Sequence, residues 1–367
     1  MSKLFEKTAI NNMTLNNRFV RSATWEGMAA EDGTCTPRLV DLMVELAEGG
    51  VGLIISSHAY IREDGQAGPW QLGVYKDEQI EALSKMVAGV HDRGGKIVLQ
   101  ISHAGYTAHP KLIRQSPLAL SNVEGFAKGE RREMSIPQIE DLVKAFSEAG
   151  RRARDAGFDG VQIHSAHGYL LSQSLSPAFN KREDQYGGSL ENRARLILEV
   201  LTTLRAILGT DYPILVKMNS EDFIDEGLTQ DDALQVGRRL QEGGIDAIEV
   251  SGGTPFSGQL GSSRVKISSE EKEAYFRKAG KRFRESLQVP IILVGGIRSF
   301  TLAEKMLNEG VADYFSMSRP FIREPNLIKR WMSGDLRRAT CVSDNQCFRQ
   351  VMAGKGIGCV AEEKQRK

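Results

Sequence analysis

The sequence predicts an α/β fold, a (β/α)8 TIM barrel with a short C-terminal tail, and three observations support this prediction. Short β-branched runs alternate with longer segments of helical period along the 367 residues. The runs are continuously hydrophobic, which indicates strands buried on both faces, as in a parallel sheet. Eight such units follow one another, as in a closed barrel. A doubly wound sheet usually has fewer strands and a G-x-G-x-x-G motif after the first one, where this chain has none.

The predicted strands follow one another from the N-terminus, each short and rich in Val, Ile, Leu or Phe. Turn residues or a helical segment follow each of them, so every strand can return to the same sheet through a helix. In chain order the strands span residues 17–23, 51–57, 96–102, 160–164, 213–219, 245–251, 290–296 and 313–318.

Helical segments occupy most of the intervals between these strands. Several begin at a capping residue and end in glycine, as Thr229 and the pair Gly243-Gly244 do for one of them. The segments after the third and fourth strands, 102–136 and 165–189, are long, which suits binding-site loops. The helical patterns span residues 37–50, 77–95, 137–157, 228–244 and 299–307.

Composition and charge are those of an ordinary globular protein. Lys and Arg number 48 against 47 Asp and Glu, so the net charge of +1 favours neither a nucleic-acid nor a membrane partner. The N-terminus has no apolar segment of signal-peptide type, and four cysteines do not suggest a secreted disulfide framework. We expect a cytoplasmic protein with a small-molecule substrate, and leave open whether it is a homo-oligomer. We expect one barrel domain over residues 1–335 and a tail over residues 336–367.

The C-terminal ends of the strands of such a barrel converge on one pocket. The residues at these ends are polar and include few carboxylates, which disfavours a glycosidase, an enzyme that needs two facing carboxylates. They are Ser22, Ala23, Thr24, Ser57, His58, Gln100, His164, Lys217, Ser251, Gly252, Gly253, Gly295, Gly296, Ser318 and Arg319.

The last two strand ends predict a phosphate site. Gly295 and Gly296 follow the seventh strand, and Ser299 is placed to cap the next helix, whose first N–H groups can bind phosphate. Arg319 follows the eighth strand and suits the same anion. The alternative is that the glycines only make tight turns and the arginine forms a surface ion pair.

Two further polar residues stand out in apolar strands. Lys217 is costly in its strand unless it meets an anion or a reactive partner, so it is a candidate for a Schiff-base amine or for a cation beside a ring that becomes anionic on reduction. Gln100 offers a donor and an acceptor, which suits the edge of a heterocyclic imide.

His164 and His167 lie together at the end of the fourth strand, shortly before Tyr169. A zinc site is disfavoured, because a third ligand is missing nearby and the helical H-E-x-x-H pattern is absent. From these residues alone, a functional pair and a pair packed in the core remain equally open.

The chain resembles the old yellow enzyme family of FMN-dependent NAD(P)H oxidoreductases over essentially its full length, in particular the 2,4-dienoyl-CoA-reductase-like branch. The resemblance rests on NRFVRSAT, on QISHAG, on the glycine and SRP loops, and above all on HSAHGYLLSQSLSPAFNKREDQYGGSLENR, which is long and distinctive. It implies bound FMN, with NAD(P)H as reductant. Larger relatives append an FAD/NAD domain after the barrel, and this chain is expected to lack one.

The resemblance also implies contacts with the flavin. Ser22, Ala23 and Thr24 would lie along the ring, with the Thr24 hydroxyl near O4 and N5. Gln100 would bind the pyrimidine edge, and Lys217 would lie by N1 and O2, where the family more often has arginine. The remaining implied cofactor contacts are Ser57, Gly252, Gly253, Gly295, Gly296, Ser318 and Arg319.

The same resemblance implies the catalytic groups. His164 and His167 would donate hydrogen bonds to the oxygen of an α,β-unsaturated carbonyl as hydride arrives from flavin N5, and Tyr169 would protonate the substrate. Glu26 would join these three residues in substrate binding. The nicotinamide would dock over the same flavin face, which predicts ping-pong kinetics. The substrate itself, and NADH against NADPH, are left open.

The tail holds Cys341, Cys347 and Cys359, with Asp344 where iron–sulfur relatives have a further cysteine. We interpret this as the remnant of a cluster motif without a metal, because cluster ligation normally needs four thiolates. The alternative is an iron–sulfur flavoprotein of the dienoyl-CoA reductase type that passes electrons to a partner or to another substrate. A barrel that binds flavin without catalysis is a third hypothesis. Cys35 is expected to be a packing residue.

Overall fold

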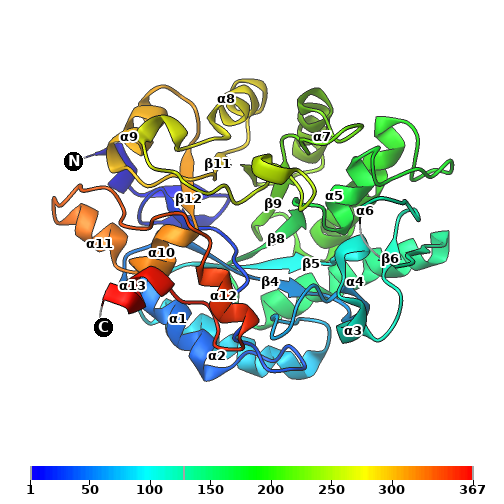
Figure 1. The fold of residues 1–367 in the computed structure, drawn as a ribbon, viewed down its shortest axis with the longest axis horizontal. Helices are drawn as coiled ribbons and strands as arrows, with labels where there is room; N and C mark the ends of the chain where they lie inside the picture. The colour runs from blue at the N-terminus through cyan, green and yellow to red at the C-terminus, as the bar shows by residue number, and fades with distance from the viewer. Residues whose placement is uncertain (1, 127–128, 366–367) are drawn as a thin grey trace.

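The computed structural model describes residues 2–126 and 129–365, and its centre is a closed barrel of eight parallel strands. Neighbouring strands pair in the order β10-β11-β12-β3-β4-β5-β8-β9, with helices packed around them (Figure 1). The predicted TIM barrel is therefore confirmed. The strands are β3 (Phe19–Arg21), β4 (Leu53–Tyr60), β5 (Ile97–Ser102), β8 (Gly160–Ser165), β9 (Ile214–Asn219), β10 (Ala247–Ser251), β11 (Ile291–Leu293) and β12 (Tyr314–Met317).

Each strand overlaps its predicted segment, but β4 continues to Tyr60, three residues past the predicted end, and the predicted helical segments form helices. Thr229 caps α7 by accepting a hydrogen bond from Asp232 N at 3.2 Å, and Gly243 follows the last residue of that helix, as predicted. The outer helices are α1 (Pro37–Glu48), α2 (Ile80–His91), α4 (Ile136–Asp155), α6 (Leu190–Leu208), α7 (Gln230–Glu242), α8 (Arg277–Ser286) and α9 (Phe300–Asn308).

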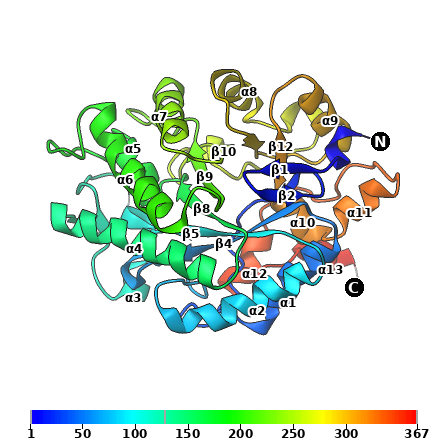
Figure 2. The same ribbon diagram turned by 180° about the vertical axis from the view of Figure 1, so that it is seen from behind.

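A hairpin that the sequence analysis did not identify closes the lower end of the barrel. It consists of β1 (Thr8–Ile10) and β2 (Met13–Leu15), and Figure 2 shows it on the face opposite that of Figure 1. Its apolar side chains join the inward-facing ones of the strands in a single cluster. That cluster contains Ile10, Met13, Leu15, Val20, Leu53, Ile55, Val98, Leu215, Ala247, Ile292 and Tyr314.

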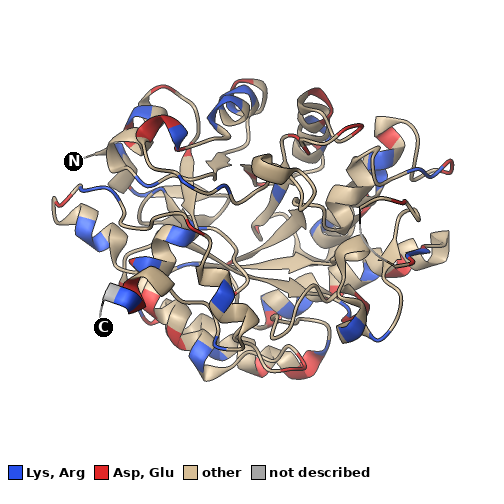
Figure 3. Cartoon of the chain, in the orientation of Figure 1, with Lys and Arg blue, Asp and Glu red and all other residues tan. Residues whose placement is uncertain are grey.

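A second and larger apolar core lies between the strands and the surrounding helices, where outward-facing residues such as Ile54, Val216 and Ile248 are fully buried. Charged residues lie mostly on the helices and loops outside this core, with both signs interspersed (Figure 3). No helix among the described residues is both long and apolar enough to cross a membrane.

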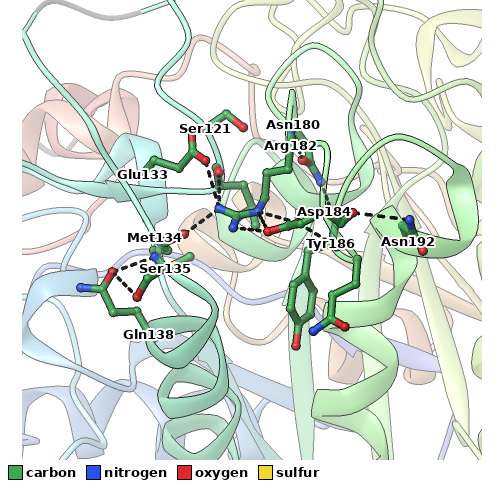
Figure 4. Close-up of polar contacts among 12 residues, drawn as sticks. Ser121, Glu133, Met134, Ser135, Gln138, Asn180, Arg182, Asp184, Tyr186 and Asn192 are labelled. Carbon is green, nitrogen blue, oxygen red and sulfur yellow. Dashed lines mark hydrogen bonds and ion pairs between the residues drawn. The ribbon is translucent and has the colours of Figure 1, made fainter.

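The long loops after β5 and β8 are joined by one buried arginine (Figure 4). Arg182 donates to the carbonyl oxygens of Leu120 and Met134, at 3.0 and 2.6 Å, and forms an ion pair with Asp184. The two carbonyls belong to the first loop, which carries the short strands β6 (Leu118–Ala119) and β7 (Arg132–Glu133). The second loop carries the buried helix α5 (Leu170–Leu175). These contacts hold both loops at the open end of the barrel.

The C-terminal segment packs against the barrel. It contains α12 (Cys347–Met352) and α13 (Val360–Gln365), which lie beside α10 (Arg319–Arg323) and α1 in Figure 1. Cys347, Val351 and Ile357 form a small apolar cluster with barrel residues that include Trp25. The final residues of the predicted tail, 366–367, lie outside the described part of the chain, as do residue 1 and residues 127–128.

Truncating the hairpin should destabilise the barrel. Leu15 is fully buried in the interior cluster, so Leu15→Ala removes apolar burial and leaves a cavity. We expect the free energy of unfolding in urea to fall by about 2–5 kcal/mol. Leu336→Ala, at a side chain that is 42% exposed, is the matched control and should change it by less than about 0.5 kcal/mol. Equal effects of the two substitutions would contradict the role of the hairpin.

Candidate active site

A cavity opens at the C-terminal ends of the barrel strands and contains about 1000 Å³ of space, its open mouth included. Twelve of the sixteen predicted site residues contribute to its wall. Trp25, Met317 and Phe348 add apolar surface. The twelve are Ser22, Ala23, Thr24, Gln100, His164, His167, Tyr169, Lys217, Gly295, Gly296, Ser318 and Arg319.

A buried cation–carboxylate pair lies at the inner end of this cavity. Lys217 on β9 and Glu249 on β10 are adjacent in the sheet register, and their Nζ and Oε1 atoms are 3.3 Å apart. The same carboxylate oxygen accepts from the hydroxyls of Ser22 at 2.7 Å and Ser316 at 2.9 Å. Lys217 also donates to Ser22 Oγ at 2.7 Å. The lysine therefore meets the anion that its apolar strand required.

Two glutamine side chains extend this network across the barrel. Gln162 Nε2 donates to Glu249 Oε2 at 2.9 Å, and Gln100 Nε2 donates to Gln162 Oε1 at 2.6 Å. Both residues are buried on neighbouring strands, where they are register partners. Only Gln100 of the two reaches the cavity wall. The network thus ends at an amide that can contact a ligand.

The three predicted catalytic side chains lie together beside this network. The His164 ring is 5.5 Å from the His167 ring and 4.5 Å from the Tyr169 ring, measured between centroids. His167 Nε2 is 2.7 Å from Ser251 Oγ, while His164 Nδ1 is buried without a hydrogen-bond partner in the described chain. A buried polar atom left unpaired costs about 1–3 kcal/mol, so it marks a place where a ligand group is expected.

Burial determines the protonation of these groups. It lowers the pKa of His164 and of His167 well below the ordinary value, and nearby positive charge, including Lys217, lowers both further. Burial also raises the pKa of the Tyr169 phenol. At neutral pH the two imidazoles are therefore uncharged N–H donors and the phenol keeps its proton.

A third imidazole, that of His58, joins the group because β4 contains one extra residue. The pairing of β4 with β5 runs from Ile55↔Val98 to His58↔Gln100, so three steps along β4 match two along β5. Such a bulge redirects the side chains beyond it. Burial lowers the pKa of His58 to about 4, and its ring is 5.5 Å from that of Tyr169.

The same bulge accounts for Ser57, which does not line the cavity. Leu53 and Ile55 point into the barrel, and alternation would bring Ser57 to the cavity wall, but the extra residue brings His58 there instead. Ser57 Oγ donates to Glu26, whose carboxylate also pairs with Arg21. Glu26 is 1% exposed and does not line the cavity either. Its buried carboxylate is turned toward Ser57 and Arg21, the partners that a buried charge requires.

Gly252 and Gly253, which were predicted to contact the cofactor, also lie outside the cavity wall. A Cβ at Gly252 would be 2.8 Å from the Phe276 ring, and one at Gly253 would be 2.6 Å from a backbone oxygen. Close packing after β10 is therefore the reason for glycine here, and Ser251 is the residue of this loop that lines the cavity.

The other end of the cavity is suited to an anion. Gly295 and Gly296 have φ values of +125° and +75°, and a Cβ on either would lie within 3.0 Å of an aromatic ring. Arg298 lines the cavity beside them, and its Nε and Nη2 are buried without partners in the described chain. Arg319 Nη1 is held by Asn345 Oδ1 of the tail at 2.7 Å. Buried guanidinium donors without partners indicate a site that an anion completes.

The predicted role of Ser299 as a helix cap is wrong. Its side chain makes no capping hydrogen bond and donates to Glu273 Oε1 at 2.7 Å. Glu273 Oε2 accepts from the N–H groups of Arg298 and Ser299, so this carboxylate caps α9. A carboxylate fits the positive end of a helix better than a hydroxyl does. The groups suited to an anion therefore lie at the Gly295-Gly296 turn, before the helix.

The tail cysteines are separate from the catalytic side chains. Cys347 is buried, which raises the pKa of its thiol to about 11, and Cys341 and Cys359 are half-buried. Within residues 2–126 and 129–365, no three His, Cys, Asp or Glu side chains are grouped as a metal site. Burial raises the pKa of the Cys35 thiol to about 12, as expected of a packing residue.

Comparisons with known proteins agree with this geometry. The profile of the "NADH:flavin oxidoreductase / NADH oxidase family" matches residues 3–336. NADPH dehydrogenase of Bacillus subtilis (strain 168) is 34% identical over 324 residues, 88% of this chain and 92% of the relative. NADH oxidase of Thermoanaerobacter brockii is 33% identical over 363 residues, 97% of this chain and 53% of the relative. The chain thus spans about half the length of this second relative.

Two solved structures superpose on this chain over most of its length. A 2-naphthoyl-CoA reductase complex superposes with a TM-score of 0.90 at 26% identity, over 97% of this chain and 56% of that one. The old yellow enzyme homologue from Zymomonas mobilis superposes with a TM-score of 0.78 at 26% identity, over 93% and 95%.

The cavity also fits the cofactor of these proteins. Partnerless donors of Arg298 beside two glycines suit the phosphate of FMN, and Gln100 and Lys217 offer polar atoms to a heterocyclic edge. The chain belongs to the NADH:flavin oxidoreductase / NADH oxidase family.

Proposed function

We propose that this protein is an ene reductase, which reduces the activated C=C bond of α,β-unsaturated carbonyl compounds. The observation that carries this proposal is the pair of uncharged imidazoles, His164 and His167, packed beside the protonated phenol of Tyr169 at one end of a cavity whose other end suits a phosphate. Two N–H donors and one acid are the groups that such a reaction needs. Bound FMN supplies the hydride.

His164 and His167 hold the carbonyl oxygen of the substrate and stabilise the negative charge that develops on it. The Ser251 hydroxyl contributes to this role. When it donates to Nε2 of His167, the neutral ring carries its proton on Nδ1, which then becomes the donor. Buried N–H donors of this kind are already oriented, so they stabilise charge more strongly than water does.

Tyr169 supplies the proton that completes the reduction at the α-carbon. Burial keeps its phenol protonated. Helix α5 begins at the next residue, Leu170, which fixes the position of Tyr169. The neighbouring His58 and His164 rings have lowered pKa values, so they are weak bases that leave the proton on the phenol until the substrate arrives. After each transfer the phenolate regains a proton from solvent, which the raised pKa of Tyr169 favours.

The wall residues of the cavity are proposed as the FMN contacts. Ser22, Ala23, Thr24, Gln100 and Lys217 would lie along the ring, and the ribityl phosphate would bind at Gly295, Gly296, Ser318 and Arg319, with Arg298 added from the structure. NAD(P)H and the oxidant would use this one cavity in turn, so the kinetics would be ping-pong.

The first test is the flavin chemistry itself. We expect purified protein reconstituted with FMN to be yellow, to be bleached by NADPH or NADH under anaerobic conditions, and to regain its colour when 2-cyclohexenone is added. Stopped-flow absorbance at the flavin band measures both half-reactions, and each nucleotide can be compared in the first. Protein that cannot retain FMN, or reduced protein that the enone does not reoxidise, would refute the proposal.

Removal of the oxygen-binding imidazole should affect the second half-reaction. For His164→Ala we expect the kcat/KM for the enone to fall about 10²–10³-fold, because one donor to the developing charge is lost. For Tyr169→Phe the rate of reoxidation should fall about 10²–10⁴-fold, because the proton donor is lost. His109→Ala, at an exposed histidine outside the cavity, is the control and should match the parent. A barrel that only stores flavin would show no turnover for any of these variants to reduce.

The uncharged imidazoles also predict the pH dependence. Because the pKa values of His164 and His167 are lowered, the neutral forms persist as the pH falls, and the raised pKa of Tyr169 keeps the phenol protonated as it rises. The rate of reoxidation by an enone should therefore vary by less than about twofold between pH 8 and pH 6. A histidine of ordinary pKa, about 6.5, would be mostly protonated at pH 6 and would produce a decline of about fourfold. Such a decline would contradict the assignment.

A further inference from the structure

Glu249 is the one carboxylate in the buried network at the inner end of the cavity, and it was not among the predicted site residues. It is fully buried on β10 and accepts hydrogen bonds from four side chains. Three of them reach Oε1, and the fourth, Gln162, reaches Oε2 at 2.9 Å. Ser22 and Lys217, which are among these donors, also line the cavity.

The carboxylate determines which way two buried amides point. An ionised carboxylate only accepts hydrogen bonds, so Gln162 must present Nε2 to it. The Oε1 atom of Gln162 then faces Gln100, which must present its own Nε2, at 2.6 Å. Gln100 is left with its carbonyl oxygen as an unused acceptor for a ligand in the cavity. The orientation of both amides thus follows from the negative charge of Glu249, which accepts hydrogen bonds and cannot donate them.

The same carboxylate partly neutralises the positive charge of Lys217. Two of the three N–H bonds of this lysine are used, toward Ser22 Oγ at 2.7 Å and toward Glu249 at 3.3 Å. The third has no partner in the described chain, and Lys217 lines the cavity. A ligand in the cavity therefore contacts Lys217, whose positive charge is partly neutralised by Glu249 on its other side. Both cavity-facing groups, Gln100 and Lys217, thus depend on Glu249.

We propose that Glu249 is a positioning residue that sets the reduction potential of the bound flavin, through Lys217, and presents the Gln100 carbonyl to it. The proposal rests on the FMN site described above. The flavin becomes anionic when it is reduced, so an uncompensated lysine beside it favours the reduced form. With Glu249 in place this preference is moderated, and the flavin remains able to pass its hydride to an enone.

The test is the isosteric substitution Glu249→Gln, measured as the midpoint potential of the FMN-bound protein by anaerobic dye equilibration. We expect reduced FMN to gain at least about tenfold in affinity relative to oxidised FMN, which for a two-electron couple is a rise of about 30 mV. Oxidised FMN should bind more weakly than to the parent in fluorescence titrations, because Gln162 and Gln100 lose their fixed direction. Glu324→Gln, at a partly buried ion pair with Arg330 outside the cavity, is the control and should leave the potential unchanged.

A double-mutant cycle separates this role from a merely structural one. In a Lys217→Met background, Glu249→Gln should shift the potential much less than it does alone, because the coupling runs through the lysine. An unchanged or lowered potential in Glu249→Gln, or an undiminished shift in the Lys217→Met background, would overturn the proposal. If Glu249→Gln does not fold, Glu249→Asp, which withdraws the carboxylate by one methylene group, should raise the potential by a smaller amount.

Failure of this inference can be distinguished from failure of the proposed function. If the parent protein binds no FMN, the FMN site itself is wrong. If the parent binds FMN and reduces an enone but the potential does not respond to Glu249→Gln, only the role of Glu249 is refuted.

Discussion

The contact between Lys217 and Glu249 is the constraint on which the upper half of the barrel depends. A charge buried without a partner is strongly unfavourable, and removal of one member of a buried pair typically costs about 3–5 kcal/mol. The pair lies on adjacent strands, and donors from β8, from β12 and from Ser22 immediately after β3 complete it. The strands that close the barrel therefore also supply the hydrogen-bond donors of Glu249.

Charge is unevenly distributed along the cavity, and this is what makes the two ends chemically different. Arg298 and Arg319 lie at the glycine turn, Lys217 lies at the inner wall, and the histidines at the far end are uncharged. The cation at the inner wall helps to keep His164 and His167 uncharged. A region suited to an anion and a region of neutral hydrogen-bond donors thus coexist in one pocket, and Lys217 favours the uncharged state of the second.

The periodicity of apolar residues predicted the eight strands and most outer helices, because strand burial and helix amphipathicity are local patterns. It missed the hairpin of β1 and β2, whose three-residue strands are too short to show a period. Most cavity residues could be predicted because strand ends converge. The position of Ser57 could not be predicted, because a continuous apolar run does not show an extra residue in β4. The capping role of Ser299 was predicted wrongly because Glu273, which takes that role, is distant in sequence. Glu249 carried the same signal as Lys217, a charge in an apolar strand.

The extra residue in β4 has a consequence for how such a pocket can change over evolutionary time. Below it, Leu53 and Ile55 remain packed in the interior cluster, and beyond it His58 lines the cavity. The gain or loss of a single residue at this point would exchange the wall-forming side chain without repacking the layer beneath. A one-residue change in the length of β4 could thus alter the specificity of the cavity while the interior cluster stays packed.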